Sequence, residues 1–311
     1  MDTVKKKLTV VVPVYNEEDN VEHFAQAIHE ALDNLDYDYT LLFIDDGSQD
    51  SSRVKIRAME ETDSHIGHLF LSKNYGHQAA LTCGLNNAEG DVVITMDGDM
   101  QHPPALLPEL LKKWEEGYEV VQTIREATEG VGFFKRFTSA TYYKLVNLIA
   151  TIPIQPGGSD FRLMDRKAVL AYREYQEQSP FIRGIIGSMG YKQVQFPFVA
   201  PERFAGKSKF SLKKMMKFAM DGILNNSVLP LRISFYVGLL SMVFSIGLFA
   251  HVMYETWVGD TVAGWSTIML CLSFFGGVQL LVLGVLGEYV GRIFLEVKNR
   301  PRYLIQDRCR V

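Results

Sequence analysis

Residues 8–17 read LTVVVPVYNE, and this stretch decides the fold class. The run from Leu8 to Val14 is short, apolar and rich in β-branched residues, which favours a buried strand. A polar turn at Tyr15-Asn16-Glu17 follows it, and residues 21–35 then place apolar side chains at helical spacing. We therefore expect a strand, a turn and a helix in that order.

The same pattern recurs before residue 100. Strand-like runs cover residues 40–44, 68–71 and 92–96, and a helical stretch covers residues 78–87. Strands that alternate with helices predict an α/β fold with a mostly parallel sheet covered on both faces. Ligands of such sheets bind at the carboxyl ends of the strands. One rim should therefore carry the polar residues that follow the strands: Glu17, Asp45, Asp46, Asp97 and Asp99.

Composition excludes several classes of protein. The 311 residues include 32 Lys and Arg against 36 Asp and Glu, a net charge of −4, so there is no basic excess for binding nucleic acid. With 47% hydrophobic and 22% charged residues, the chain is not of the disordered class. Its three cysteines are far apart, which favours neither a disulfide framework nor a zinc cluster and suits a reducing compartment.

Two long uncharged stretches lie after residue 232. Residues 233–254 and 261–287 lack Lys, Arg, Asp and Glu over 22 and 27 positions. Each exceeds the roughly 20 residues that an apolar helix needs to cross a bilayer. Buried helices of a soluble core would show charges at shorter intervals. The charged start of the chain, residues 1–8, is not typical of a signal peptide.

The segment before these stretches has the pattern of an amphipathic helix. Apolar residues fall three or four positions apart, at Leu212, Met215, Met216, Ala219 and Ile223. The other face carries Lys213, Lys214, Lys217 and Asp221. Such a helix suits an anionic bilayer surface, and the alternative is a helix packed on the preceding domain.

A pair of carboxylates offers a cation site. Neither G-x-G-x-x-G nor G-x-x-x-x-G-K-[ST] occurs, which argues against a dinucleotide dehydrogenase and a P-loop kinase. Asp97 and Asp99 follow a strand on a tight turn, where they can converge on a hard cation that neutralises a diphosphate. The same spacing also occurs by chance in loops, but the strand before it and Pro103-Pro104 after it favour a site.

Together, three motifs resemble the family 2 inverting glycosyltransferases with a GT-A fold: VPVYNE at residues 12–17, DDGS at 45–48 and DGDMQ at 97–101. Three more resemble the polyprenyl-phosphate branch, which includes bactoprenol glucosyltransferases and dolichol-phosphate mannose synthases: NYGHQ at 74–78, SDFRLMDR at 159–166 and RFAGKSK at 203–209. The resemblance covers nearly the whole chain and includes the two carboxy-terminal spans.

This resemblance implies roles for individual residues. Nucleotide-sugar binding is expected of Pro13, Tyr15, Glu17, Asp46 and Asp97, although the same residues could be turn and capping residues. Asp97, Asp99 and Gln101 are expected to hold Mg²⁺ or Mn²⁺. The expected catalytic residues are Asp99, Asp160 and Arg203.

Asp160 matches the acceptor-side carboxylate of the family. A phosphate monoester with a second pKa of about 6 is already largely anionic at pH 7, so no strong base is needed. We therefore expect Asp160 to position the acceptor or donor, the alternative being a mainly structural role. Ser159 stands where close relatives often have glycine.

Two negative groups meet in such a reaction, so cations beyond the metal are needed. The candidates for binding the acceptor phosphate are Arg125, Arg136, Arg203 and Lys209, each of which could instead be a solvated surface residue. His77 and His102 are expected to be loop or packing residues.

The sequence thus predicts transfer of one sugar, glucose from UDP-glucose, onto undecaprenyl or another polyprenyl phosphate for cell-envelope glycan modification. Alternatives are a processive polysaccharide synthase, whose Q-x-x-R-W motif is absent, and a non-catalytic membrane scaffold. We expect a catalytic domain over residues 1–210, an interfacial helix over 211–228, a hairpin over 229–291 with spans near 233–254 and 262–287, and a basic tail over 292–311.

The positive-inside tendency predicts the orientation of this hairpin. Lys and Arg residues flank both ends of the hairpin, and residues 255–261 between the spans contain none. We therefore expect a protein of the cytoplasmic membrane with its catalytic domain and carboxyl terminus in the cytoplasm. A homo-oligomer is compatible with the sequence.

Overall fold

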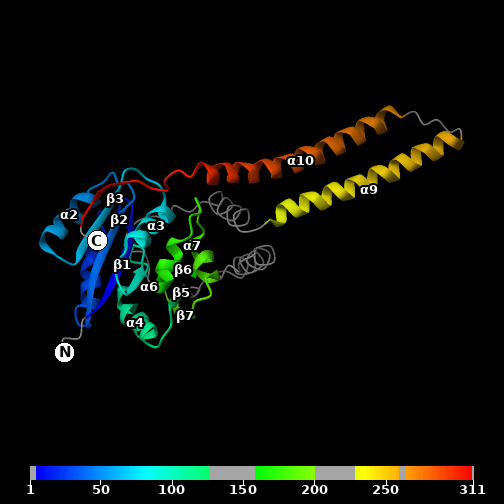
Figure 1. Cartoon of the computed structure of the whole chain (residues 1–311). Coiled ribbons are helices and arrows are strands. Elements are labelled where there is room, and N and C mark those ends of the chain that lie inside the picture. The colour runs from blue at the N-terminus through cyan, green and yellow to red at the C-terminus, as the bar shows by residue number, and fades with distance from the viewer. Residues whose placement is uncertain (1–4, 126–157, 179, 200–227, 259–263, 310–311) are drawn as a thin grey trace. The chain divides into compact units, whose positions relative to one another are not determined.

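A computed structural model describes residues 5–125, 158–178, 180–199, 228–258 and 264–309 (Figure 1). Within these ranges the chain forms two compact units. Residues up to 199 together with 301–309 make the first unit, and residues 228–300 make the second. The first is built on a sheet with the strand order β7-β5-β6-β4-β1-β2-β3-β8.

The strands of this sheet are β1 (Lys6–Val14), β2 (Tyr37–Asp45), β3 (Ile66–Leu71), β4 (Val92–Thr95), β5 (Val120–Arg125), β6 (Gly158–Asp165), β7 (Gln193–Phe198) and β8 (Ile305–Arg308). The helices of the first unit are α1 (Val21–Leu32), α2 (Ser52–Thr62), α3 (His77–Asn87), the 3-10 turn η1 (Pro104–Leu106), α4 (Leu107–Glu115), α6 (Arg166–Arg173) and α7 (Ile182–Ser188).

The predicted parallel core is confirmed. β1 pairs in parallel with β2 and β4, and β2 pairs in parallel with β3. The sheet is extended on one side by β6, which runs antiparallel to β4 and β5, and on the other by β8, which runs antiparallel to β3. The strands β5, β6, β7 and β8 were not part of the sequence prediction.

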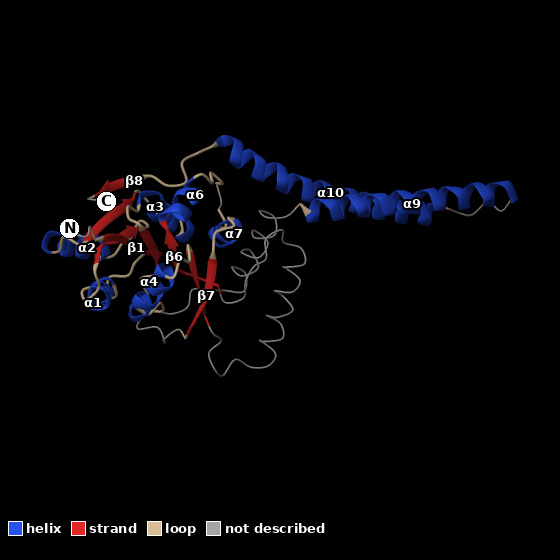
Figure 2. Ribbon diagram, turned by 60° about the horizontal axis from the view of Figure 1, so that its bottom comes forward, coloured by secondary structure: helices blue, strands red, loops and turns tan. Residues whose placement is uncertain are grey.

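Helices cover both faces of the sheet, as predicted (Figure 2). Alternating side chains of β1 belong to two hydrophobic cores, one on each face of the sheet. Val10 and Val12 share a core with α1 and α4, whereas Val11 shares one with α3, α6 and α7. Helix α3 approaches β1 so closely that a Cβ on Gly84 would lie 2.2 Å from Val11 Cγ1. Only a residue without a side chain fits there.

The second unit contains two long apolar helices, α9 (Leu229–Val258) and α10 (Trp265–Lys298). The stretches long and apolar enough to cross a membrane are Leu229–Tyr254 and Phe274–Lys298. The second stretch overlaps the predicted span 262–287, and α10 continues unbroken through Glu288 and Arg292, which form an ion pair at 3.0 Å. The predicted interfacial helix falls almost wholly outside the described residues.

The segment 292–311, expected as a basic tail, is divided in the structure. Its first residues continue α10, and Ile305–Arg308 form the edge strand β8 of the first unit. Four residues with alternating burial are too short a pattern to be recognised as a strand in the sequence. The chain therefore returns to the sheet after the hairpin.

Candidate active site

The polar residues that follow β1, β2 and β4 lie at the carboxyl edge of the sheet, as predicted. Those that follow β2 and β4 meet Asp160 of β6 at the start of α3. His77 Nε2 lies 3.6 Å from Asp97 Oδ1 and 3.3 Å from Asp160 Oδ2. The preceding backbone N–H, that of Gly76, donates to Asp46 at 2.8 Å. Asp46, Asp97 and Asp160, which come from three different strands, are thus brought around one loop.

Asp46 holds that loop. Its buried carboxylate accepts hydrogen bonds from the backbone N–H groups of Tyr75 at 2.7 Å and Gly76 at 2.8 Å. Burial raises the pKa of Asp46, and these two hydrogen bonds partly offset the rise. Asp46 is therefore positioned to orient the residues before α3, including His77.

Asp45 fixes the neighbouring turn. Its Oδ1 accepts from the N–H groups of Gly47 and Ser48 at 3.1 Å and from Arg53 Nε at 2.5 Å. Gly47 has φ +76°, and a Cβ there would lie 2.4 Å from the carbonyl carbon of Lys73. The glycine of the DDGS motif is thus required by both its conformation and its neighbours.

The residues that follow β1 are placed at the same rim. Pro13 is buried within β1, and Tyr15 is 37% exposed. The Glu17 backbone N–H donates to Ser52 Oγ at 3.0 Å, and its carboxylate accepts from Asn20 Nδ2 at 2.6 Å. Glu17 therefore supports the start of α1, and a nucleotide-binding role for it stays a prediction.

The DGD turn has the chemistry of a hard-cation site. Asp97 Oδ1 is buried and has no hydrogen bond to the described residues. Asp99 Oδ1 accepts from the Gln101 backbone N–H at 3.1 Å, and Met100 between them has φ +62°. A buried carboxylate oxygen without a hydrogen bond, beside a second carboxylate and an amide, fits a divalent cation that prefers oxygen ligands.

His102 connects this turn to Asp160. Its Nδ1 accepts from the Asp97 backbone N–H at 2.8 Å, so Nε2 carries the proton and donates to Ser159 Oγ at 2.7 Å. The ring also stacks on Phe161 with centroids 5.2 Å apart. Burial lowers the pKa of His102, so the imidazole is neutral. Ser159, which stands where close relatives often have glycine, is thus hydrogen-bonded to His102.

Asp160 is buried in a cluster of cations. Arg183 binds it through Nε at 2.9 Å and Nη2 at 3.0 Å, and Arg162 Nη2 lies 2.9 Å from Oδ1. Burial would raise the pKa of Asp160, but Arg183, His77 and Arg162 together hold it well below its usual range. Burial lowers the pKa of Arg162 to about 10, so it stays charged at neutral pH.

His77 carries positive charge between two carboxylates. Burial alone would lower its pKa, but the hydrogen bond to Asp160 and the charges of Asp97 and Asp160 outweigh this effect and raise it to about 9. The side chain is 43% exposed, so the imidazolium borders both the protein and the solvent.

The sequence matches two family descriptions. Residues 9–173 match "Glycosyl transferase family 2", and residues 229–293 match "GtrB C-terminal hairpin". The chain belongs to glycosyl transferase family 2. It is 40% identical over 299 residues to the uncharacterized glycosyltransferase YkcC of Bacillus subtilis, covering 96% of this chain and 93% of that one.

The SfII prophage-derived bactoprenol glucosyl transferase of Shigella flexneri is 38% identical over 301 residues, covering 96% of this chain and 97% of that one. Among solved structures, glucosyl-3-phosphoglycerate synthase of Mycobacterium tuberculosis is 18% identical, with a TM-score of 0.43 over 70% of this chain and 78% of that one.

The structure of this glycosyltransferase adds three residues that the sequence did not predict for the site: His77, His102 and Arg183. His77 lies within the NYGHQ motif and His102 directly follows the DGDMQ motif, a signal that could have marked both. Arg183 had no such signal, because α7 reaches Asp160 only through the fold. Arg125 ends β5 and is exposed, and its charge acts on His102. Arg136, Arg203 and Lys209 lie outside the described residues.

Proposed function

We propose that this glycosyltransferase transfers one glucose from UDP-glucose to the phosphate of a membrane polyprenyl phosphate, with inversion at the anomeric carbon. The observation that carries the proposal is the near full-length similarity to bactoprenol glucosyl transferases, which extends through the hairpin. The product would be a polyprenyl-phosphate β-glucose.

The donor end of the site is the rim formed after β1, β2 and β4. Asp97 and Asp99, with Gln101, would hold Mg²⁺ or Mn²⁺, and the ion would supply charge neutralisation for the departing UDP diphosphate. Pro13, Tyr15 and Glu17 border the place where the nucleotide would lie. Asp46 would act through the loop that it holds, which presents His77 toward the reacting groups.

The acceptor end is assigned to the cations around Asp160. Arg183, with its side chain 38% exposed, and the half-exposed His77 offer positive charge to an anionic acceptor. Asp160 is a weak base because its pKa lies well below its usual range. A phosphate monoester that is already anionic needs no proton removed. Asp160 therefore holds Arg183 and His77 in place, and the acceptor phosphate attacks unaided.

Inversion follows from the attack of the acceptor oxygen on the face of the sugar opposite the leaving diphosphate. The α-linked glucose of UDP-glucose becomes β-linked in a single displacement. Arg203, Arg136 and Lys209 remain candidates for binding the lipid phosphate, and Arg125 stands at the end of β5.

We also propose that the hairpin crosses the cytoplasmic membrane twice, with the first unit in the cytoplasm. Strand β8 pairs with β3, so residues 301–309 after the hairpin belong to the same unit as the residues up to 199 that precede it. Two crossings return the chain to the side from which it left. The charge asymmetry of the flanking segments favours the cytoplasmic side.

Topology is tested by cysteine labelling in intact cells. Gly259→Cys, in the connector, should react with a membrane-impermeant thiol reagent, whereas Lys112→Cys, exposed on α4, should react only after lysis. The unsubstituted chain measures background from the native cysteines. Labelling of Lys112→Cys in intact cells would contradict the orientation.

The activity is tested with purified protein, undecaprenyl phosphate and a panel of labelled nucleotide sugars. The proposal expects label in the lipid extract with UDP-glucose, at least tenfold above other donors. Label in a water-insoluble polymer would identify a processive synthase instead. Absence of transfer from every donor by folded protein would favour a non-catalytic scaffold.

A further inference from the structure

We propose that Glu60, His68 and Cys309 form a second cation site, of the zinc class, that fastens β8 to the edge of the sheet. The three residues come from α2, from β3 and from the position directly after β8. The site is separate from the DGD turn, which follows β4. The proposal does not depend on the sugar or acceptor of the transferase.

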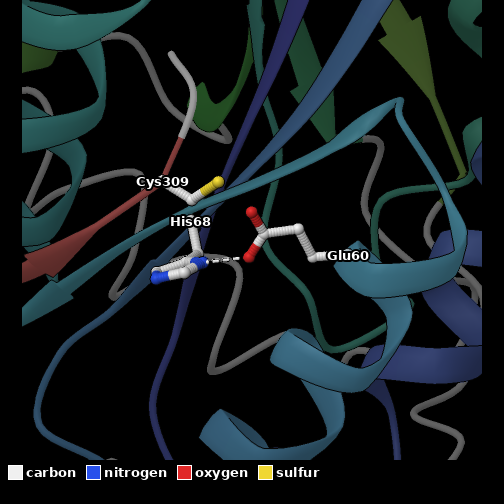
Figure 3. A group of neighbouring side chains, drawn as sticks. All are labelled: Glu60, His68 and Cys309. Carbon is white, nitrogen blue, oxygen red and sulfur yellow. Dashed lines mark hydrogen bonds and ion pairs between the residues drawn. The ribbon is translucent and has the colours of Figure 1, made fainter.

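The three side chains converge on a common space (Figure 3). Their ligand atoms all lie within 4.8 Å of one another, and Glu60 Oε2 lies 2.6 Å from His68 Nδ1. Together they provide one oxygen, one nitrogen and one sulfur. Zinc ligands at about 2.0–2.3 Å from the ion lie roughly 3–4 Å from each other, so modest side-chain rotations would complete the site.

Strand pairing brings the cysteine there. β8 runs antiparallel to β3, and the Cys309 backbone N–H donates to the His68 carbonyl at 3.1 Å. The wide spacing of the three cysteines argues against a cysteine cluster in the sequence, but it says nothing about one cysteine that the fold brings beside a histidine and a glutamate.

The far side of the imidazole has the arrangement of a metal-bound histidine. His68 is 4% exposed, and its Nε2 has no hydrogen bond to the described residues. Nε2 lies 3.5 Å from Asp307 Oδ2, and Asp307 is itself paired with Arg57. A histidine that binds a metal commonly directs its other ring nitrogen at a carboxylate, which fixes the ring and strengthens the ligand.

The donor set selects the ion. A thiolate and an imidazole suit Zn²⁺ and similar transition metals, whereas the oxygen ligands of the DGD turn suit Mg²⁺ or Mn²⁺. The two sites would therefore bind different ions in the same molecule. With three protein ligands, the fourth position of a tetrahedral ion would go to water.

Occupancy would stabilise the attachment of the returning strand. Arg53 links this strand to the donor rim, because Nη1 donates to Gln306 Oε1 at 3.3 Å and Nε to Asp45 at 2.5 Å. An ion that holds β8 in place would thus also support the turn that carries Asp46.

The test uses the purified full chain titrated with Co²⁺, a spectroscopic substitute for Zn²⁺. We expect a thiolate-to-Co²⁺ charge-transfer absorption that saturates at one ion per chain and disappears when Zn²⁺ is added. Cys309→Ser should abolish the band, while Cys271→Ser and Asp99→Asn should keep it. Asp307→Asn should weaken Co²⁺ binding about tenfold or more.

Glu60→Gln provides a second check on the ligand set. It leaves the thiol intact and should weaken binding at least tenfold, with circular dichroism showing that the variant is folded. No charge-transfer band in folded protein, a band that persists in Cys309→Ser, or unchanged affinity in Glu60→Gln would overturn the proposal.

Discussion

Val54 in α2 and Leu240 in α9 are each 70% exposed. They belong to different regions: the first unit buries most of its apolar side chains, whereas the hairpin exposes many of its own. The strands and helices of the first unit bury nearly all of their apolar side chains. Among its described residues, the large apolar side chains that are exposed are Tyr15, Val54, Leu170, Val199 and Leu304. In the described part of the hairpin, exposed Leu, Val, Ile and Phe side chains follow one another along both helices.

This difference is the one that the proposed crossing of a bilayer requires. An exposed apolar surface of that extent is unfavourable in water but suits the hydrocarbon of a bilayer. Charges follow the same division. The first unit carries charges on its surface and in the buried cluster around Asp160, whereas the spans carry few.

The largest effect is expected where the charges of the first unit perform chemistry. Asp99→Asn should reduce transfer at least a hundredfold, because metal stabilisation of the leaving group is worth several kcal/mol. Initial rates of lipid-linked product measure it. Asp91→Asn is the control, since Asp91 lies before β4, at the opposite end of that strand, and contacts the Lys7 backbone N–H at 2.9 Å. Near-normal turnover in Asp99→Asn would remove this residue from the metal site.

Removing one partner of the buried ion cluster should destabilise the first unit strongly. Asp160→Asn leaves Arg162 fully buried without its charge partner, and we expect a loss of about 3 kcal/mol in the free energy of unfolding at pH 7. Denaturant unfolding measures it. Asp36→Asn, which breaks an exposed pair with Lys5, should change little.

This cluster also predicts a pH dependence. The folded-state pKa of Asp160 is depressed, so its stabilisation is present above the unfolded value of about 3.9 and is lost as the pH falls through the lower folded value. The stability difference between Asp160→Asn and the parent should therefore persist at pH 5 and shrink only in stronger acid. A difference that vanishes between pH 7 and 5 would contradict the depressed pKa.

The comparison between Val54 and Leu240 can be tested directly. Leu240→Asp should cost about 3 kcal/mol of membrane insertion if the side chain lies near the bilayer centre. Val54→Asp, equally exposed, should change stability by no more than about 0.5 kcal/mol. The amount of Leu240→Asp protein that stays in carbonate-washed membranes measures its insertion. Thermal unfolding measures the stability of Val54→Asp. Equal tolerance of both substitutions would mean that α9 does not face lipid.

The smallest expected effect tests the packing of the first unit. Gly84→Ala forces a methyl group against Val11 and should destabilise the protein by about 1–3 kcal/mol in thermal unfolding. Gly187→Ala in α7 meets no atom within 4 Å and should be neutral or stabilising by up to about 1 kcal/mol. The reverse order would contradict the close approach of α3 to β1.

The sequence could predict the parallel core because each of β1 to β4 is a continuous apolar run followed by a polar turn. It could also predict the DGD turn, since the two carboxylates are only two positions apart in the chain. The strands β6 and β8 could not be predicted in this way, because their positions in the sheet depend on antiparallel pairing with strands that are distant in the chain. Arg183 and Cys309 reach their neighbours only through that pairing and packing, so no local pattern marks them.

The proposed transfer is tested most directly by the structure of the product formed from UDP-glucose and undecaprenyl phosphate. NMR of the extracted lipid should show one glucose per polyprenyl phosphate, joined to the phosphate through a β anomeric linkage. An α linkage would contradict a single inverting displacement, and more than one glucose per lipid would contradict transfer of a single sugar.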